Sequence, residues 1–163
     1  RQLPIPLFTH IYRMIMRNIY ILAHNILVLP VVYLCVGKSI SIECLLFIPG
    51  FIILIINLAW MSLVLSILCA RFRDLTQIIA SLLQIFFYIT PIIWMPTLLP
   101  ARASLMILEP NPFFHLLAIV RNPLLSQPTT LNNWAISCLL GVLGTIASII
   151  FFNVYRRRIA YWI

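Results

Sequence analysis

Long apolar runs constrain the fold of this chain more than any other feature. We place four predicted membrane-spanning helices at residues 19–36, 45–69, 75–95 and 134–155. A run of about 20 apolar residues crosses the hydrocarbon of a bilayer at about 1.5 Å per residue. The first run is short and contains His24, Asn25 and Pro30, which predict a kink or a need for support from neighbouring helices.

The composition agrees with a protein that lies in lipid. The chain is 63% hydrophobic and 9% charged, whereas about a quarter of the residues of a soluble domain are charged. Its net charge of +8 does not indicate nucleic acid binding, because the basic residues lie at the ends of apolar runs rather than over a polar surface. We therefore predict an all-α integral membrane protein with a single transmembrane domain over residues 1–163.

The distribution of basic residues predicts an orientation. Most of them lie on one predicted side of the membrane: Arg1, Arg13, Arg17, Arg71, Arg73, Arg156, Arg157 and Arg158. The other side receives Lys38, Arg102 and Arg121, which Glu43 and Glu109 nearly balance. By the positive-inside rule, both ends of the chain and the turn after the second span face the cytoplasm.

Residues 96–133 are predicted to form an extracytoplasmic cap. Six prolines exclude a long helix here: Pro96, Pro100, Pro110, Pro112, Pro123 and Pro128. The apolar segments 103–108 and 113–120 are too short to cross a bilayer, so we expect short interfacial or re-entrant helices with a turn at Asn111-Pro112. The region either covers a pathway or braces the helix bundle.

A charged turn leads into a helix that has one polar side. The turn is Arg71-Phe72-Arg73-Asp74, and the run that follows carries polar side chains at spacings that place them on one helix face: Gln77, Ser81, Gln84 and Tyr88. This stripe either lines a path for hydroxyl-rich molecules or joins two helices. We expect Asp74 to cap the helix and to pair with Arg71 or Arg73.

Two further patterns lie inside the spans. Asn57 and Trp60 are one helical turn apart in the second span, where they either make a helix-to-helix hydrogen bond or line a solute path. Ser137, Gly141 and Thr145 recur at intervals of four residues in the last span. Small residues at this spacing allow close helix packing, either within the chain or with a second copy.

Catalytic and metal-binding patterns are absent from the sequence. The three acids lie outside the spans, so no carboxylate pair or intramembrane acid is available. The histidines lack metal-ligand spacing, the chain contains no C-x-x-C, and no glycine-rich phosphate loop of the P-loop type is present. Cys35 and Cys44 are either a disulfide or two inert thiols. We predict no enzyme activity, metal or cofactor, so any ATP must bind to another polypeptide.

Four segments of the sequence together form a recognisable pattern: RFRDLTQIIASLLQIFFYITPIIWMP, EPNPFFHLLAIVRNPLL, the closing YRRRIAYWI and the early RNIYILAHN. The distinctive positions in them are Arg71, Phe72, Arg73, Asp74, Thr90, Pro91, Asn111, Pro112 and Arg121. With these segments, the chain resembles the membrane subunit of ABC-2 type transporters that export polysaccharide, the O-antigen, capsular polysaccharide and lipopolysaccharide group.

The resemblance implies a fold and partners. Such permeases have six spans, so this chain corresponds to the later four and lacks the N-terminal part. They work as homodimers bound to cytoplasmic ATP-binding subunits, which hold ATP and Mg²⁺, and they move a lipid-linked glycan across the bacterial inner membrane. Drug or lipid efflux by the same broad class and a non-transporting membrane scaffold are the alternatives.

The same resemblance, together with the polar patterns, assigns candidate site residues. Coupling to the ATP-binding subunit is assigned to Arg71, Phe72, Arg73 and Asp74; the alternative is that this turn only anchors the topology through its positive charge. The candidate translocation path comprises Asn57, Trp60, Gln77, Ser81, Gln84 and Tyr88. The candidate outer gate comprises Pro91, Asn111, Pro112 and Arg121.

Overall fold

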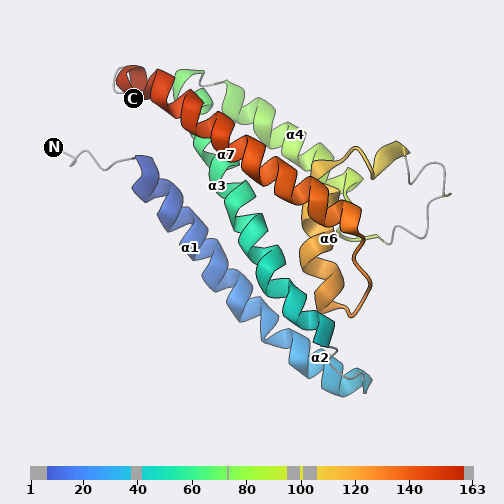
Figure 1. Ribbon diagram of the computed structural model, residues 1–163. Coiled ribbons are helices and arrows are strands. Elements are labelled where there is room, and N and C mark those ends of the chain that lie inside the picture. Colours follow the sequence, from blue (N-terminus) through green and yellow to red (C-terminus); the bar gives the residue numbers. More distant parts are fainter. Residues whose placement is uncertain (1–6, 38–41, 73, 95–99, 101–105, 160–163) are drawn as a thin grey trace.

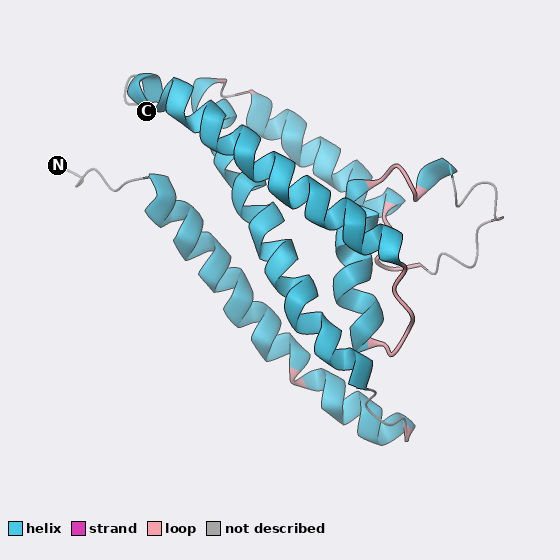
Figure 2. Cartoon of the chain, viewed as in Figure 1, coloured by secondary structure: helices cyan, strands magenta, loops and turns pink. Residues whose placement is uncertain are grey.

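The computed structural model describes residues 7–37, 42–72, 74–94, 100 and 106–159. Over these residues the protein consists of helices and short connecting loops and contains no strand (Figures 1 and 2). The expected all-helical class is therefore confirmed for the described part of the chain. Its elements are α1 (Leu7–Ile26), α2 (Val28–Val36), the 3₁₀ helix η1 (Ile42–Leu46), α3 (Phe47–Arg71), α4 (Leu75–Ile89), α6 (Pro112–Leu124) and α7 (Leu131–Ile159).

Within the part of the chain that the structure describes, three helical stretches are long and apolar enough to cross a membrane: Thr9–Cys35, Ile42–Arg71 and Leu131–Arg156. The predicted runs 45–69 and 134–155 lie inside the second and third of them. The first stretch begins well before the predicted residue 19. The helix extends through Arg13 and Arg17 because its backbone hydrogen bonds do not require apolar side chains.

The predicted run 75–95 is represented by a shorter helix. α4 has 15 residues, about 22 Å at about 1.5 Å per residue, compared with about 30 Å of hydrocarbon. It ends at Ile89, and Thr90 is extended at φ −74° and ψ 132°, since a residue before proline disfavours helical geometry. The predicted end at Met95 lies outside the described residues, so a fourth span stays a prediction.

The structure places the helix irregularity that was predicted within residues 19–36 at Leu27. The backbone N–H of Leu27 bonds the His24 carbonyl at 3.2 Å, and α2 begins at the next residue. Pro30 lies in the first turn of α2, where it offers no N–H to the Ile26 carbonyl. The helix is therefore interrupted between α1 and α2, although the two segments follow the same direction (Figure 1).

α3 and α7 lie side by side and run in the same direction, while α1 runs the opposite way along α3 (Figure 1). A small apolar core lies at one end of this arrangement. It consists of Leu63 and Ile67, and the residues packed against it are Ile11, Phe151, Phe152 and Tyr155. The start of α1, the end of α7 and the turn between α3 and α4 are all found at this end (Figure 1). We call it the termini end.

The opposite half of the bundle contains α6, which contacts both α3 and α7. Its buried residues are His115, Leu116, Ala118, Ile119 and Pro123. A Cβ atom at Gly50 of α3 would collide with the Ile119 carbonyl oxygen, so glycine is required for this approach. Within the predicted cap, α6 therefore packs against two of the long helices. Residues 96–99 and 101–105 of the predicted cap lie outside the described residues.

The α3 to α7 contact depends on Gly144. A Cβ atom there would overlap the indole ring of Trp60. We expect Gly144→Leu to destabilise the protein by about 1–3 kcal/mol, the usual cost of overpacking. The measurement is thermal or denaturant unfolding of the purified protein in detergent.

The matched control is Ala147→Leu, which places the same side chain at an exposed position of α7. It should leave the unfolding midpoint nearly unchanged. Equal midpoints for the two leucine variants would contradict the packing described here.

Candidate functional site

Asn57 joins α3 to α7 in the middle of the bundle. Its side chain is 0% exposed, and its Nδ2 donates to the Ile53 carbonyl at 2.9 Å and to the Ser137 carbonyl at 3.2 Å. The Trp60 indole Nε1 donates to Asn57 Oδ1 at 3.1 Å. These bonds use both amide protons and the amide oxygen of Asn57. Of the two interpretations of Asn57 and Trp60, this geometry is the helix-to-helix hydrogen bond.

The small residues of α7 lie at the same contact. A Cβ atom at Gly141 would meet Asn57 Nδ2 at 3.1 Å, and Gly144 lies directly against Trp60. The spacing of small residues in the last span therefore serves packing within the chain. Ser137 is 0% exposed, and its hydroxyl has no hydrogen-bond partner within the described residues.

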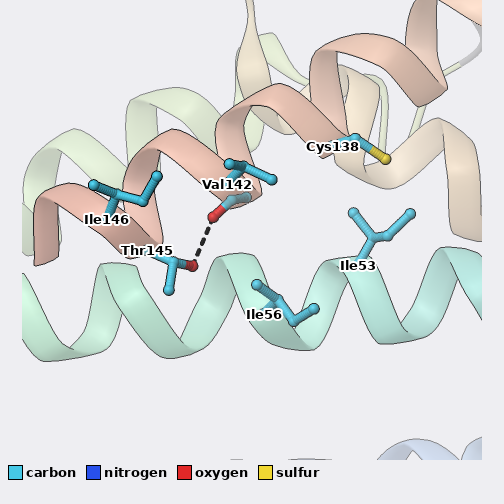
Figure 3. Close-up of a pocket in the computed structure, with 7 residues that line it drawn as sticks. Ile53, Ile56, Cys138, Val142, Thr145 and Ile146 are labelled. Atoms are coloured by element: carbon cyan, nitrogen blue, oxygen red, sulfur yellow. Dashed lines mark hydrogen bonds between the residues drawn. The ribbon is translucent and has the colours of Figure 1, made fainter. Parts of the chain in front are cut away.

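An apolar groove of about 450 Å³ borders this contact. Figure 3 shows Ile53 and Ile56 of α3 facing Cys138, Val142, Thr145 and Ile146 of α7. The only hydroxyl in the lining, that of Thr145, donates to the Gly141 carbonyl at 2.6 Å. The groove therefore offers no free hydroxyl to a polar solute and suits contact with hydrocarbon.

The candidate outer gate residues meet where α4 ends and α6 begins. The Nδ2 of Asn111 donates to the Thr90 hydroxyl at 2.9 Å, and the Arg121 guanidinium donates to the Pro91 carbonyl at 2.7 Å. Asn111 also caps α6 by accepting from the Phe113 N–H at 3.0 Å, and Pro112 is the first residue of that helix. The structure thus brings the Thr-Pro and Asn-Pro elements together. We call Thr90, Pro91, Asn111 and Arg121 the α4–α6 joint.

A second set of polar contacts lies beside this joint, and the sequence did not predict it. His115 is 1% exposed, and its ring nitrogens bond Asn133 Oδ1 and the Glu109 carbonyl, each at 2.8 Å. The Asn132 amide donates to the Glu109 carboxylate at 3.0 Å. The histidine within the apolar segment 113–120 could have predicted these contacts, because a buried imidazole requires hydrogen-bond partners on both nitrogens.

The polar stripe of α4 lies on its unpacked face. The side chains of Gln77, Ser81, Gln84 and Tyr88 are all exposed. On the opposite face the Phe86 ring packs on Phe113 of α6, with the centroids 5.1 Å apart. At about 3.6 residues per turn, Ile79 and Phe86 share one side of α4 and the stripe lies on the other. The described chain therefore leaves the stripe without a helix against it.

The charged turn is exposed at the termini end. The Arg71 guanidinium carbon lies 5.0 Å from the centroid of the Phe72 ring, and Phe72 is half exposed. Arg73 lies outside the described residues. Asp74 is positioned at the N-cap of α4, but its side chain makes no capping hydrogen bond, so the capping prediction is wrong. The backbone of Asp74 is helical at φ −70° and ψ −21°, whereas a capping side chain requires an extended N-cap residue.

Among the described residues, no group of three His, Cys, Asp or Glu side chains is placed to hold a metal ion. Cys35 and Cys44 are free thiols. No protein-family model, curated protein or solved structure matches this chain. Within the described residues, the fold is all-helical and contains three helical stretches long and apolar enough to cross a membrane. Its polar side-chain contacts include those around Asn57, at the α4–α6 joint and around His115.

The hydrogen bond from Asn111 to Thr90 in the α4–α6 joint predicts how substitutions at Thr90 change the free energy of unfolding. In Thr90→Val a methyl group replaces the hydroxyl, which leaves the buried Asn111 amide without its acceptor. We expect a loss of about 1–3 kcal/mol of unfolding free energy, measured in detergent. Thr90→Ser keeps the hydroxyl and is the matched control. If serine and valine destabilised the protein equally, packing rather than the hydrogen bond would hold α4 to α6.

Proposed function

We propose that this chain is the permease subunit of an ATP-driven exporter that moves a lipid-linked polysaccharide across the bacterial inner membrane. The observation that carries the proposal is α4, a helix with a polar stripe on its unpacked face. One end of α4 begins at the exposed charged turn, and its other end is held by the α4–α6 joint. This arrangement supports a helix that transmits movement between two ends of a membrane protein.

The stripe itself supports a path for a polar solute. Glutamine side chains facing hydrocarbon are costly, so polar residues in membrane helices face water or other polar groups. Two amides, a hydroxyl and a phenol arranged along one face match the hydrogen-bonding groups of a glycan. In the proposal, a second copy of the chain forms the opposite wall.

The charged turn is the proposed contact with a cytoplasmic ATP-binding subunit. Its exposed aromatic ring and neighbouring charges would dock into a groove of that subunit, which binds ATP and Mg²⁺. The α4–α6 joint is the proposed outer gate. Two side-chain hydrogen bonds hold α4 there, so ATP-driven movement of α4 would open the gate by breaking them. In this proposal α4, extended by the residues after it, is the fourth span, and both termini face the cytoplasm.

Cysteine substitutions along α4 test the path. The four native cysteines are first replaced by serine or alanine. We expect a membrane-impermeant maleimide to label Gln77→Cys, Ser81→Cys, Gln84→Cys and Tyr88→Cys in the assembled transporter. Ile78→Cys and Ile85→Cys, which are exposed on other faces of α4, should be protected by lipid. If all six positions were protected from the maleimide, the result would contradict the proposed aqueous path.

A charge reversal tests the coupling turn. We expect Asp74→Arg to lower transport by roughly tenfold, about 1.4 kcal/mol of coupling, with unchanged amounts of protein in the membrane. The readouts are co-purification of the ATP-binding subunit and glycan export. The control is Asn153→Arg, which adds the same side chain at an exposed position of α7 near the termini end and should leave export unchanged. Normal export by the Asp74→Arg protein would contradict the docking role.

A further inference from the structure

The first half of α1 has a groove on its outer face that neither the fold nor the proposed transport path uses. It has a volume of about 540 Å³. The residues that line it include Tyr12, Arg13, Met16, Arg17, Tyr20 and Ile21. The opposite side of α1, which includes Ile15 and Ile19, shares a smaller cavity with α3. The groove therefore faces away from the bundle, at its edge (Figure 1).

Two unpaired cations lie in this groove. Arg13 and Arg17 are exposed, and neither makes a hydrogen bond or an ion pair within the described residues. Helix α1 contains no acidic residue. Residues four apart on a helix have Cβ atoms about 5–6 Å apart, so both guanidinium groups can reach a single phosphate, for which arginine offers a bidentate fork.

The length of the helical stretch places these arginines at the edge of the hydrocarbon. Thr9–Cys35 has 27 residues, about 40 Å at about 1.5 Å per residue, and exceeds the hydrocarbon thickness by about 10 Å. The surplus falls at the N-terminal turns, because residues 18–35 are apolar enough to fill the hydrocarbon. Arg17 then lies at the boundary and Arg13 one turn outside it.

The remaining groove residues fit the same boundary. Tyr12 and Tyr20 are 65% and 68% exposed, and tyrosine prefers the level of the lipid headgroups. Met16 and Ile21 supply apolar surface beside them. The face therefore presents cations toward the headgroups and apolar and aromatic surface toward the acyl chains.

We propose that this groove is a binding site for an acidic glycerophospholipid of the surrounding bilayer. The lipid phosphate lies between Arg13 and Arg17, beside Met16, and an acyl chain runs along Tyr20 and Ile21. Charge complementarity selects an anionic headgroup over a zwitterionic one, and the open side of the groove allows entry directly from the bilayer. The inference rests on the membrane placement in the proposed function but not on transport.

Native mass spectrometry of the full chain tests the site. The protein is reconstituted in nanodiscs with equal amounts of phosphatidylglycerol and phosphatidylcholine, then released with its bound lipid. We expect phosphatidylglycerol to be retained roughly tenfold over phosphatidylcholine, about 1.4 kcal/mol. The double variant Arg13→Gln/Arg17→Gln should abolish this preference, and Arg13→Lys/Arg17→Lys should keep part of it because the charges remain.

Arg156→Gln is the matched control, because it removes one exposed charge from α7 at the same end of the bundle. It should leave the preference unchanged. Equal retention of both lipids by the unmodified protein, or a loss in Arg156→Gln as large as in the double variant, would overturn the proposal. So would displacement of phosphatidylglycerol by an equimolar polyprenyl diphosphate, since the groove would then select a glycan carrier. Extraction of the protein from membranes by alkaline carbonate would instead show that the membrane placement fails.

Discussion

The close contact between α3 and α7 is the interaction on which the rest of the structure depends. Gly144 lies directly against the Trp60 ring, and Gly141 lies against the Asn57 amide. Because lipid is as apolar as leucine, helices in a membrane associate through close packing and hydrogen bonds rather than through a hydrophobic driving force. The glycines provide the packing, and the bond from Asn57 to the Ser137 carbonyl provides the polar link.

The pair formed by α3 and α7 gives α6 a surface on which to pack, and α6 in turn positions the end of α4. The bonds from Asn111 to Thr90 and from Arg121 to the Pro91 carbonyl hold α4 at that end. Between its ends, α4 contacts the rest of the described chain through one side, which includes Phe86. A helix held at one end by the α4–α6 joint, with an exposed charged turn at its other end and a free polar face, is the physical basis of the proposed transport function.

Much of the helical arrangement could be predicted from the sequence, because it depends on local properties. The apolar runs 45–69 and 134–155 lie within long helices, and Asn111-Pro112 marks the start of a helix. Two local expectations were less accurate. Asp74 makes no side-chain cap because its own backbone is helical, and α4 ends at Ile89 because the proline at 91 restricts Thr90. The Asp74 outcome depends on backbone angles that residue type alone does not determine, whereas the end of α4 follows from the proline at 91.

The sequence by itself determined which segments are apolar enough to form long helices and where the basic residues concentrate at the ends of apolar runs, because both follow from neighbouring residues along the chain. Only the tertiary structure decided which polar groups pair. Thr90 with Asn111 and Asn57 with Ser137 are bonded across long sequence separations. Any amide in these helices has the same bonding capacity, and only the packing of the helices determines which acceptor it reaches.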